Sequence, residues 1–566
     1  MSNLKAGEAT LQKLLNTSRQ FIVPIFQRNF SWEKKQFQQL WEDIRRAGSF
    51  SQERTHFIGS IVYIDMGTPA GRPQQLMLID GQQRLTTLSL IICALRRYVA
   101  ANKTATALIK EQKLNNQFLF NSDEAGNDRY KLLLGAQDRE TYIKILEQTE
   151  FTLAAPSVRI MECYDYFYRQ IEKCADNLDE IYLGILHLSL VAIALDKDKD
   201  NPQLIFESMN STGKDLSQSD LLRNYLLMDL AAKEQSRLYT TYWKPMEEAF
   251  GQYAYPEKFD YFIRDFLTVK YGGARICKVN DVYEQFKRYY VERNLTKEAV
   301  LKEIFIYARY YAAIELQQET DKELAAYWKQ VRTIDCHVAY PFFLQLYHDY
   351  KYGVLTKNDF ILIIKTTISY IVRRAICEMP TNSLNKTFAV FYNKIDKANY
   401  AGSVLKEYIL KTAYRAFPTD YAVREKLQTK DIYHFRLKNY LLEMLENYYH
   451  KEPIDIIKDN YTIEHIMPQS PELNDDWRAM LGENWREVQK IYLHTLGNLT
   501  LTGYNSEMGN KSFTEKLNDV NGFKHSHLRL NQFVASCEVW NKQTIRRRTN
   551  LLTDLILQIW PYPAFK

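Results

Sequence analysis

The sequence predicts a multidomain α+β protein in which helices predominate. Three observations carry this prediction: a length of 566 residues, a change of texture along the chain, and helical spacing of apolar residues over most of it. A single hydrophobic core rarely serves so long a chain, so several domains are expected. We divide the chain into residues 1–229, which mix strands and helices, residues 230–450, which are helical, and residues 451–566, which are mixed again.

The composition is that of a folded protein, with 46% hydrophobic and 25% charged residues. It excludes long disorder and low-complexity chains. The formal charge of +6 is too small to indicate nucleic-acid binding by itself, so any basic surface must be local. Seven scattered cysteines without a C-x-x-C pair argue against a disulfide framework and a cysteine zinc site. With neither a signal peptide nor an apolar stretch of bilayer length, we expect a cytoplasmic protein without a membrane partner.

In residues 1–229, strands are expected at 57–65 and 75–80, around a Gly/Pro turn, and at 188–196. The middle region is dense in Tyr and Phe at helical spacing, which is typical of interhelical packing rather than of a base-stacking platform. In the last region, strands are expected at 461–466 and 496–502, followed by helices. This order of elements places the motifs below on strand ends and helix starts.

The most specific motif lies in the last region. Residues 461–470 read YTIEHIMPQS, and HTLGNLTLT at 494–502 and YNSEMGNKSF at 504–513 follow. Hydrolysis of a phosphodiester with one divalent ion needs a histidine that deprotonates water and oxygen ligands that hold the cation. An acid–His pair or an LGNL turn alone is common at protein surfaces, but the ordered set predicts a nuclease.

Residues 461–513 resemble the HNH (ββα-metal, His-Me finger) nucleases. The resemblance implies that His465 is the general base and that Asn498 orients its ring and braces the two strands. It implies that Glu464 is a ligand of Mg²⁺ or Mn²⁺, although the family often has Asp or His at this position. The second ligand is Asn505 or, as a close competitor, Asn510. Without C-x-x-C pairs, a zinc-stabilised variant is excluded.

A second motif, LIDGQQRLTTLSLII, occupies residues 78–92. A strand ends at Asp80, Gly81 permits a tight turn, and a helix begins by Leu85. The first N–H groups of that helix form a ready phosphate site, to which Arg84 adds a charged fork. The alternative is an N-terminal capping box made by Asp80 and Gln83, which needs no ligand.

Two further segments accompany this motif: PIFQRNFSW at 24–32, and FESMNSTGKDLSQSDLLRN at 206–224, with a turn at 210–213 and a helix start at 217–220. Each alone also suits an aromatic hinge, a turn or a capped helix. With D-G-Q-Q-R, they resemble the N-terminal domain of GmrSD-type modification-dependent restriction endonucleases, whose core is similar to the ParB/sulfiredoxin fold. The HNH segment at the other end of the chain completes the same two-part architecture.

This resemblance implies a nucleotide-binding module with NTPase activity, for GTP, ATP or CTP. No Walker motif is present, so its chemistry is not of the P-loop kind. The aromatic rings of Phe26, Phe30 and Trp32 either recognise a modified base or pack, and we expect packing. The residues implied at the NTP phosphates and their Mg²⁺, or near them, are Asp80, Gly81, Gln82, Gln83, Arg84, Gln27, Arg28, Asn210 and Arg223.

Residues 511–550 carry eight Lys and Arg against three acids. Lys511 is a candidate phosphate contact. The run TIRRRTNLLTDLILQIW predicts an amphipathic helix whose Arg547 and Arg548 face DNA, although a solvated helix face explains it equally well.

The sequence therefore predicts an NTP-regulated DNA endonuclease of a restriction or anti-phage defence system, acting on modified or phage DNA. One alternative is a nucleotide-binding DNA switch without cleavage activity, and another is a nuclease toxin that ignores modification. Because one HNH site cuts one strand, cleavage of both strands requires a homodimer or two encounters. Other defence proteins are a further possible class of partner.

Overall fold

The computed structural model describes residues 5–49, 55–69, 71–102, 108–149, 156–196, 205, 216–228, 230–448, 453–504 and 508–564. The chain forms two compact units, one of residues 1–245 with 295–301, the other of residues 246–294 with 302–566. The protein is 62% helical with little sheet, which confirms the predicted mixed, multidomain and predominantly helical class. The ParB/sulfiredoxin and ββα-metal likenesses and the three-region division stay predictions.

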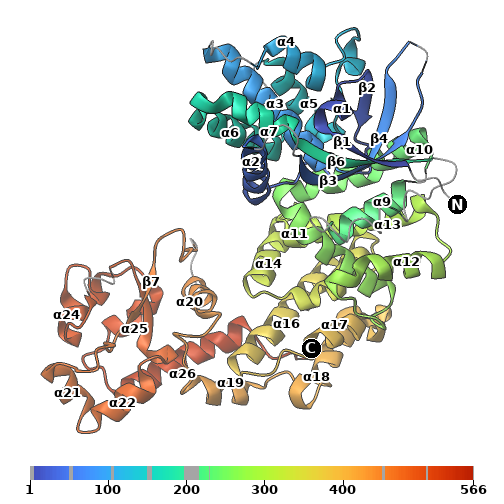
Figure 1. The fold of residues 1–566 in the computed structure, drawn as a ribbon. Coiled ribbons are helices and arrows are strands. Elements are labelled where there is room, and N and C mark those ends of the chain that lie inside the picture. Colours follow the sequence, from blue (N-terminus) through green and yellow to red (C-terminus); the bar gives the residue numbers. More distant parts are fainter. Residues whose placement is uncertain are drawn as a thin grey trace. The chain divides into compact units, whose positions relative to one another are not determined.

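The first unit is built on a six-stranded mixed sheet in the order β1-β6-β3-β4-β2-β5 (Figure 1). β3 pairs antiparallel with β4 and parallel with β6, and β2 joins β4 and β5 in parallel. The predicted strands at 57–65, 75–80 and 188–196 are confirmed as β3, β4 and β6. The strands are β1 (Lys5–Thr10), β2 (Arg19–Ile22), β3 (His56–Asp65), β4 (Gln74–Asp80), β5 (Leu132–Leu133) and β6 (Leu188–Leu195).

Both faces of this sheet are covered. The larger core lies between the sheet and the helices α1, α2, α3, α5, α6 and α7, while a smaller cluster around Val62, Ile79 and Leu195 meets α9. The helices of this unit are α1 (Leu11–Leu15), α2 (Lys34–Gly48), α3 (Gln82–Asn102), α4 (Glu111–Leu114), η1 (Asn115–Leu119), η2 (Gly126–Arg129), α5 (Ala136–Glu147), α6 (Val158–Lys173), η3 (Ala175–Asn177), α7 (Leu178–Leu186), α9 (Gln218–Leu227), α10 (Ala232–Leu238) and η5 (Tyr239–Trp243).

The second unit begins with packed helices. Tyr311, Tyr340 and Tyr370 are among its fully buried side chains, so the tyrosines of this region serve packing, as expected. These elements are α11 (Lys244–Lys270), η6 (Val279–Asp281), α12 (Val282–Glu292), α13 (Lys297–Glu315), α14 (Lys322–Thr333), η7 (His337–Ala339), α15 (Tyr340–Lys351), α16 (Lys357–Ile376), α17 (Leu384–Phe391), η8 (Tyr392–Lys394), η9 (Lys397–Asn399), α18 (Tyr400–Ile409), η10 (Ala413–Arg415), α19 (Asp420–Leu427) and α20 (Lys438–Asn447). α11 and α13 cross the boundary between the units.

The end of the chain holds a two-stranded antiparallel sheet of β7 and β8. Helices surround it and share a core centred on Trp477, Phe513 and Trp540. These elements are β7 (Thr462–His465), α21 (Asp475–Leu481), α22 (Trp485–Tyr492), η11 (Leu496–Asn498), β8 (Leu499–Thr502), α24 (Phe513–Asn518), η12 (Phe523–His525), α25 (Arg529–Ala535) and α26 (Lys542–Ile559). No helix in the described part of the chain is long and apolar enough to cross a membrane.

Candidate functional site

His465 ends β7 and is only 3% exposed. It pairs with Leu499 of β8, and the next residue, Ile466, donates its N–H to the carbonyl of Asn498 (3.0 Å). Thus the two predicted nuclease motifs, separated by α21 and α22, meet as neighbouring strands. The main chain on both sides of His465 is fixed by this pairing.

Asn498 is fully buried and uses both ends of its amide. Its oxygen accepts from the Met467 N–H (2.8 Å) and the Trp540 indole (3.0 Å), and its nitrogen donates to the carbonyls of Met467 (3.1 Å) and Leu493 (2.9 Å). Asn498 therefore clamps the chain two residues after His465 to the start of β8. These contacts brace the backbone; the His465 ring itself bonds to another histidine.

That histidine is His494, whose Nδ1 lies 3.0 Å from Nε2 of His465. The Tyr433 ring meets the His465 ring edge to face, with centroids 4.6 Å apart. The pKa of His465 is lowered to about 3, chiefly by burial and in smaller part by His494 and Lys516. A neutral imidazole is the form that accepts a proton from water.

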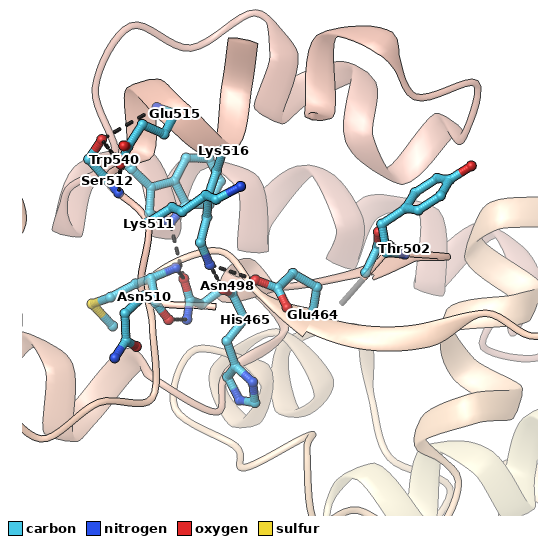
Figure 2. Close-up of polar contacts among 12 residues, drawn as sticks. Glu464, His465, Asn498, Thr502, Asn510, Lys511, Ser512, Glu515, Lys516 and Trp540 are labelled. Atoms are coloured by element: carbon cyan, nitrogen blue, oxygen red, sulfur yellow. Dashed lines mark hydrogen bonds and ion pairs between the residues drawn. The ribbon is translucent and has the colours of Figure 1, made fainter. Parts of the chain in front are cut away.

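Glu464 is buried beside Lys516. The Lys516 ammonium lies 2.5 Å from Glu464 Oε1 and also donates to the His465 carbonyl (2.9 Å) (Figure 2). Burial raises the pKa of Glu464 and lowers the pKa of Lys516, and the attraction between the two groups opposes both shifts. The short contact favours an ionised pair, which ties α24 to the His465 strand.

This pair bears on the metal that the HNH resemblance implies. The Glu464 carboxylate already contacts a cation, and the Asn510 amide points away from it (Figure 2). The other predicted ligand, Asn505, lies outside the described residues. Glu464 and Asn510 as placed do not fit a shared divalent ion, because such an ion needs both oxygens within about 2–2.6 Å.

Another group near His465 has the composition of a metal site. Asp431, His434 and His494 each offer one ligand atom, and these atoms lie within 4.8 Å of one another. None of the three was assigned a role from the sequence. The available signal was the D-x-x-H spacing of Asp431 and His434, but it falls in the region read as a helical spacer.

The predicted DNA contacts occupy different environments. Lys511 forms a half-exposed ion pair with Asp519 (2.6 Å), and Arg547 is exposed on α26. Arg548 is fully buried and donates to the carbonyls of Gly497 (2.9 Å), Leu499 (2.6 Å) and Leu530 (3.0 Å). We therefore assign Arg548 to the fold, since it offers no exposed donor to a phosphate, and keep Arg547 as a candidate.

In the first unit, the predicted nucleotide motifs meet at the end of β4. Gln27 donates to the carbonyl of Ile79 (2.9 Å), and Gln82 donates to that of Arg28 (3.2 Å). Gln83 accepts from the Ser31 N–H (2.8 Å) and donates to the Asn29 carbonyl (3.2 Å). The Gln83 amide thus holds residues 29–31, which leaves the capping-box alternative without support.

The third motif joins the same place through Arg223. This buried guanidinium donates to the Phe26 carbonyl (2.9 Å) and pairs with Asp220 (2.9 Å), one turn earlier on α9. Ser217 caps α9 by accepting from the Asp220 N–H (3.1 Å), as the sequence predicted. Asn210 lies outside the described residues. Phe26 and Phe30 are buried, which favours their packing role.

This junction holds three arginines against two aspartates, and some of its buried polar atoms have no hydrogen-bond partner. Burial lowers the pKa of Arg28, with Asp220 and Asp80 opposing that shift, and burial likewise lowers the pKa of Arg84. Within the described part of the chain, Gln82 Oε1 and both amide atoms of Asn224 are buried without a hydrogen-bond partner. Unpartnered buried polar atoms are costly. Gln82 also contacts the Arg28 backbone, so a polar ligand near Arg28 could satisfy its free oxygen.

Gly81 is required by its surroundings as well as by its backbone. Its φ is +89°, and an added Cβ would lie 2.9 Å from both Ile61 Cγ1 and the Ser60 carbonyl oxygen. Gly67 has a similar φ of +84° but nothing within 4 Å of such a Cβ. We expect Gly67→Ala to cost about 1–2 kcal/mol and Gly81→Ala about 2–5 kcal/mol of unfolding free energy.

Urea denaturation of the two glycine variants checks this expectation. Equal losses would mean that β3 yields to the new methyl group, and that the turn at Gly81 is less tightly packed than described. A larger loss for Gly81→Ala would show that the close approach of β3 to this turn is rigid.

Two family models match the chain. Residues 11–227 match the N-terminal domain of the GmrSD restriction endonucleases, and residues 417–555 match their C-terminal domain. Together the matches span more than half of the chain, and both groups of candidate residues lie inside them. No curated protein matches the chain.

Proposed function

Because the chain belongs to the GmrSD family of restriction endonucleases, we propose that it is a nucleotide-regulated DNA endonuclease in which His465 activates the attacking water. The single observation that carries the cutting centre is His465 itself. It is a buried, neutral histidine on a strand clamped by Asn498, within the matched C-terminal domain. A braced imidazole of this kind can take a proton at a fixed position.

We assign the following roles in DNA cleavage to residues of this chain. Asn498 and Lys516 hold the backbone around His465, through Met467 and the His465 carbonyl respectively. The His465 ring accepts the proton from the water that attacks the phosphodiester, which requires that its bond to His494 leaves one ring nitrogen free for that water. The exposed Arg547 contacts the DNA backbone. No step is assigned to Glu464 as a metal ligand.

The nucleotide binds in the first unit, where three distant motifs meet. Arg28 and Arg84 would pair with its phosphates and Asp80 would hold its Mg²⁺, while the unpartnered amide oxygen of Gln82 and the amide of Asn224 would supply polar contacts. Hydrolysis would remove the contacts that the terminal phosphate makes with this junction, and we expect that change in the first unit to regulate cleavage. Modified or phage DNA is the proposed substrate.

The test combines supercoiled plasmid and modified phage DNA with Mg²⁺ or Mn²⁺ and each NTP in turn. We expect nucleotide-dependent cutting by the wild type, and cutting that no longer responds to nucleotide in Asp80→Ala. Asp123→Ala, which changes an exposed aspartate in the same unit, serves as the matched control. If Asp80→Ala stays fully responsive, the nucleotide assignment is wrong.

The same assay separates the alternatives. DNA binding and NTP turnover without cutting under any metal would point to the DNA-binding switch. Equal cutting of modified and unmodified DNA would point to a toxin that ignores modification.

A further inference from the structure

We propose that Asp431, His434 and His494 bind a divalent first-row transition-metal ion next to His465. The inference rests on the proposed nuclease for its role in cleavage, but the site itself is argued from the geometry of these side chains. It assigns the metal to residues other than Glu464 and Asn510, which as placed do not fit a shared ion.

The three side chains are brought together by main-chain contacts. Asp431 and His434 lie in the loop between α19 and α20, and His494 lies between α22 and η11. The Ile432 N–H donates to the His494 carbonyl (2.8 Å), which joins the two segments. The His434 N–H donates to Asp431 Oδ1 (2.9 Å), which fixes the carboxylate toward the histidine. Backbone N–H groups therefore hold the two segments together and orient the Asp431 carboxylate.

The distances suit an ion. Ligands about 2.1 Å from a metal lie about 3.0 Å apart as octahedral neighbours and about 4.2 Å apart on opposite sides. Asp431 Oδ2 and His434 Nδ1 are 2.9 Å apart, and all three ligand atoms fall within 4.8 Å. Small side-chain rotations close the remaining difference. The 2.9 Å contact also has the length of an Asp–His hydrogen bond without a metal. The experiment below distinguishes a metal site from such a hydrogen bond.

The donor set selects the class of metal. Two imidazole nitrogens and one carboxylate favour a divalent first-row transition-metal ion over Mg²⁺, which prefers oxygen ligands and its own waters. Asp431 and His434 are exposed and His494 is half-buried, so further coordination positions face solvent. Three protein ligands leave coordination positions open, unlike the four ligands of a closed structural zinc site.

The site is one hydrogen bond from His465. His494 Nδ1 faces His465 Nε2 at 3.0 Å, which leaves Nε2 of His494 for the ion. A metal-bound histidine commonly gives its other N–H to an acceptor, and here that acceptor is Nε2 of His465. The neutral His465 ring then keeps its own proton on Nδ1 and has no nitrogen free for water. The Tyr433 ring stacks on His494 and meets His465 edge to face, which keeps the two imidazoles in register. The ion would thus set the tautomers of His494 and His465, and His465 could take a proton from water only after the ion leaves His494.

Isothermal titration of the full-length protein with Mn²⁺ alone, without nucleotide, tests the site. We expect one Mn²⁺ per chain in the wild type, and at least tenfold weaker binding in Asp431→Asn and in His434→Ala. Both residues are exposed loop positions, and circular dichroism checks that the variants fold. His525→Ala, an exposed histidine of the same unit, should bind like the wild type. The absorption spectrum of bound Co²⁺ should change in His434→Ala, because a nitrogen ligand is lost.

The variant Glu464→Gln tests whether the metal binds at Glu464 instead. Unchanged Mn²⁺ affinity in Asp431→Asn and His434→Ala would overturn the inference, and its loss in Glu464→Gln alone would return the metal to Glu464. Cutting of DNA without Mn²⁺ binding at this cluster would sink this inference only. Mn²⁺ binding that depends on Asp431 and His434, without cutting of any DNA, would sink the proposed function only.

Discussion

Replacing His465 with alanine is expected to lower the rate of DNA cleavage by a factor of about 10²–10⁴, the range that a positioned general base contributes. The residue is almost fully buried, and chiefly for that reason its pKa is lowered to about 3. The wild-type ring is therefore neutral in assays near neutral pH. Alanine removes the proton acceptor and leaves the Asn498 clamp on Met467 in place. Rates of plasmid nicking at saturating protein measure the effect.

Two further variants serve as controls for the His465→Ala measurement. His525→Ala removes an exposed histidine of the same unit and should keep the wild-type rate. His465→Gln fills more of the space against Tyr433, so it separates the loss of the base from the loss of packing. Wild-type cleavage by both His465 variants, with their folds intact, would remove His465 from the mechanism.

The second large effect is expected on stability, at the buried ion pair of Glu464 and Lys516. Lys516→Met removes the ammonium and leaves the Glu464 carboxylate buried without its partner, at a cost of about 3–5 kcal/mol of unfolding free energy. It also removes the donor to the His465 carbonyl. Chemical denaturation followed by tryptophan fluorescence, with Trp477, Trp485 and Trp540 as local reporters, measures the loss.

The control for this variant is Lys511→Met, which breaks a half-exposed ion pair with Asp519 and should cost no more than about 1 kcal/mol. The double variant Glu464→Gln with Lys516→Met should regain part of the stability, because no uncompensated charge is left. A double variant that is no more stable than Lys516→Met would show that the cost comes from the lost contact with the His465 carbonyl.

Where the sequence carried local signals, the structure follows them. β3, β4 and β6 arise from short apolar runs bounded by turn residues, and α9 starts at the capping serine Ser217. β7 and β8 pair as the acid–His and LGNLTLT segments indicated. The three N-terminal motifs also meet, although no local rule fixes that Gln27, Gln82 and Arg223 share one junction; the resemblance supplied it.

Arg548, which the sequence analysis assigned to DNA, could have been recognised as buried from the helical spacing of its neighbours. In α26 the buried residues include Ile545, Thr549, Leu552 and Ile556. Arg548 lies three residues after Ile545 and four before Leu552, so it shares their face, while Arg547 is turned outward. Three consecutive arginines conceal this difference when only charge is counted. The spacing alone would have placed Arg548 inside.

Other partners were beyond reach of the sequence because they depend on tertiary contacts. Lys516 reaches Glu464 only because of how α24 docks on β7, which no motif encodes. Asp431 and His434 come from a loop before the segment that resembles a nuclease, and a backbone bond to His494 brings them close. Long-range placement of single polar side chains is decided by packing.

The dependence of the β7–β8 pair on α26 has a consequence for synthesis of the protein. Arg548 follows Leu499, whose carbonyl it binds, by 49 residues, and Trp540 follows Asn498 by 42 residues. A ribosome adds about 5–20 residues per second, so the His465 strand emerges seconds before the groups that brace it. A nascent or prematurely terminated copy that lacks α26 also lacks the Arg548 contacts to the Gly497 and Leu499 carbonyls, so we expect its β7–β8 pair to be unstable. The proposed nuclease would therefore be inactive until its last long helix has been made.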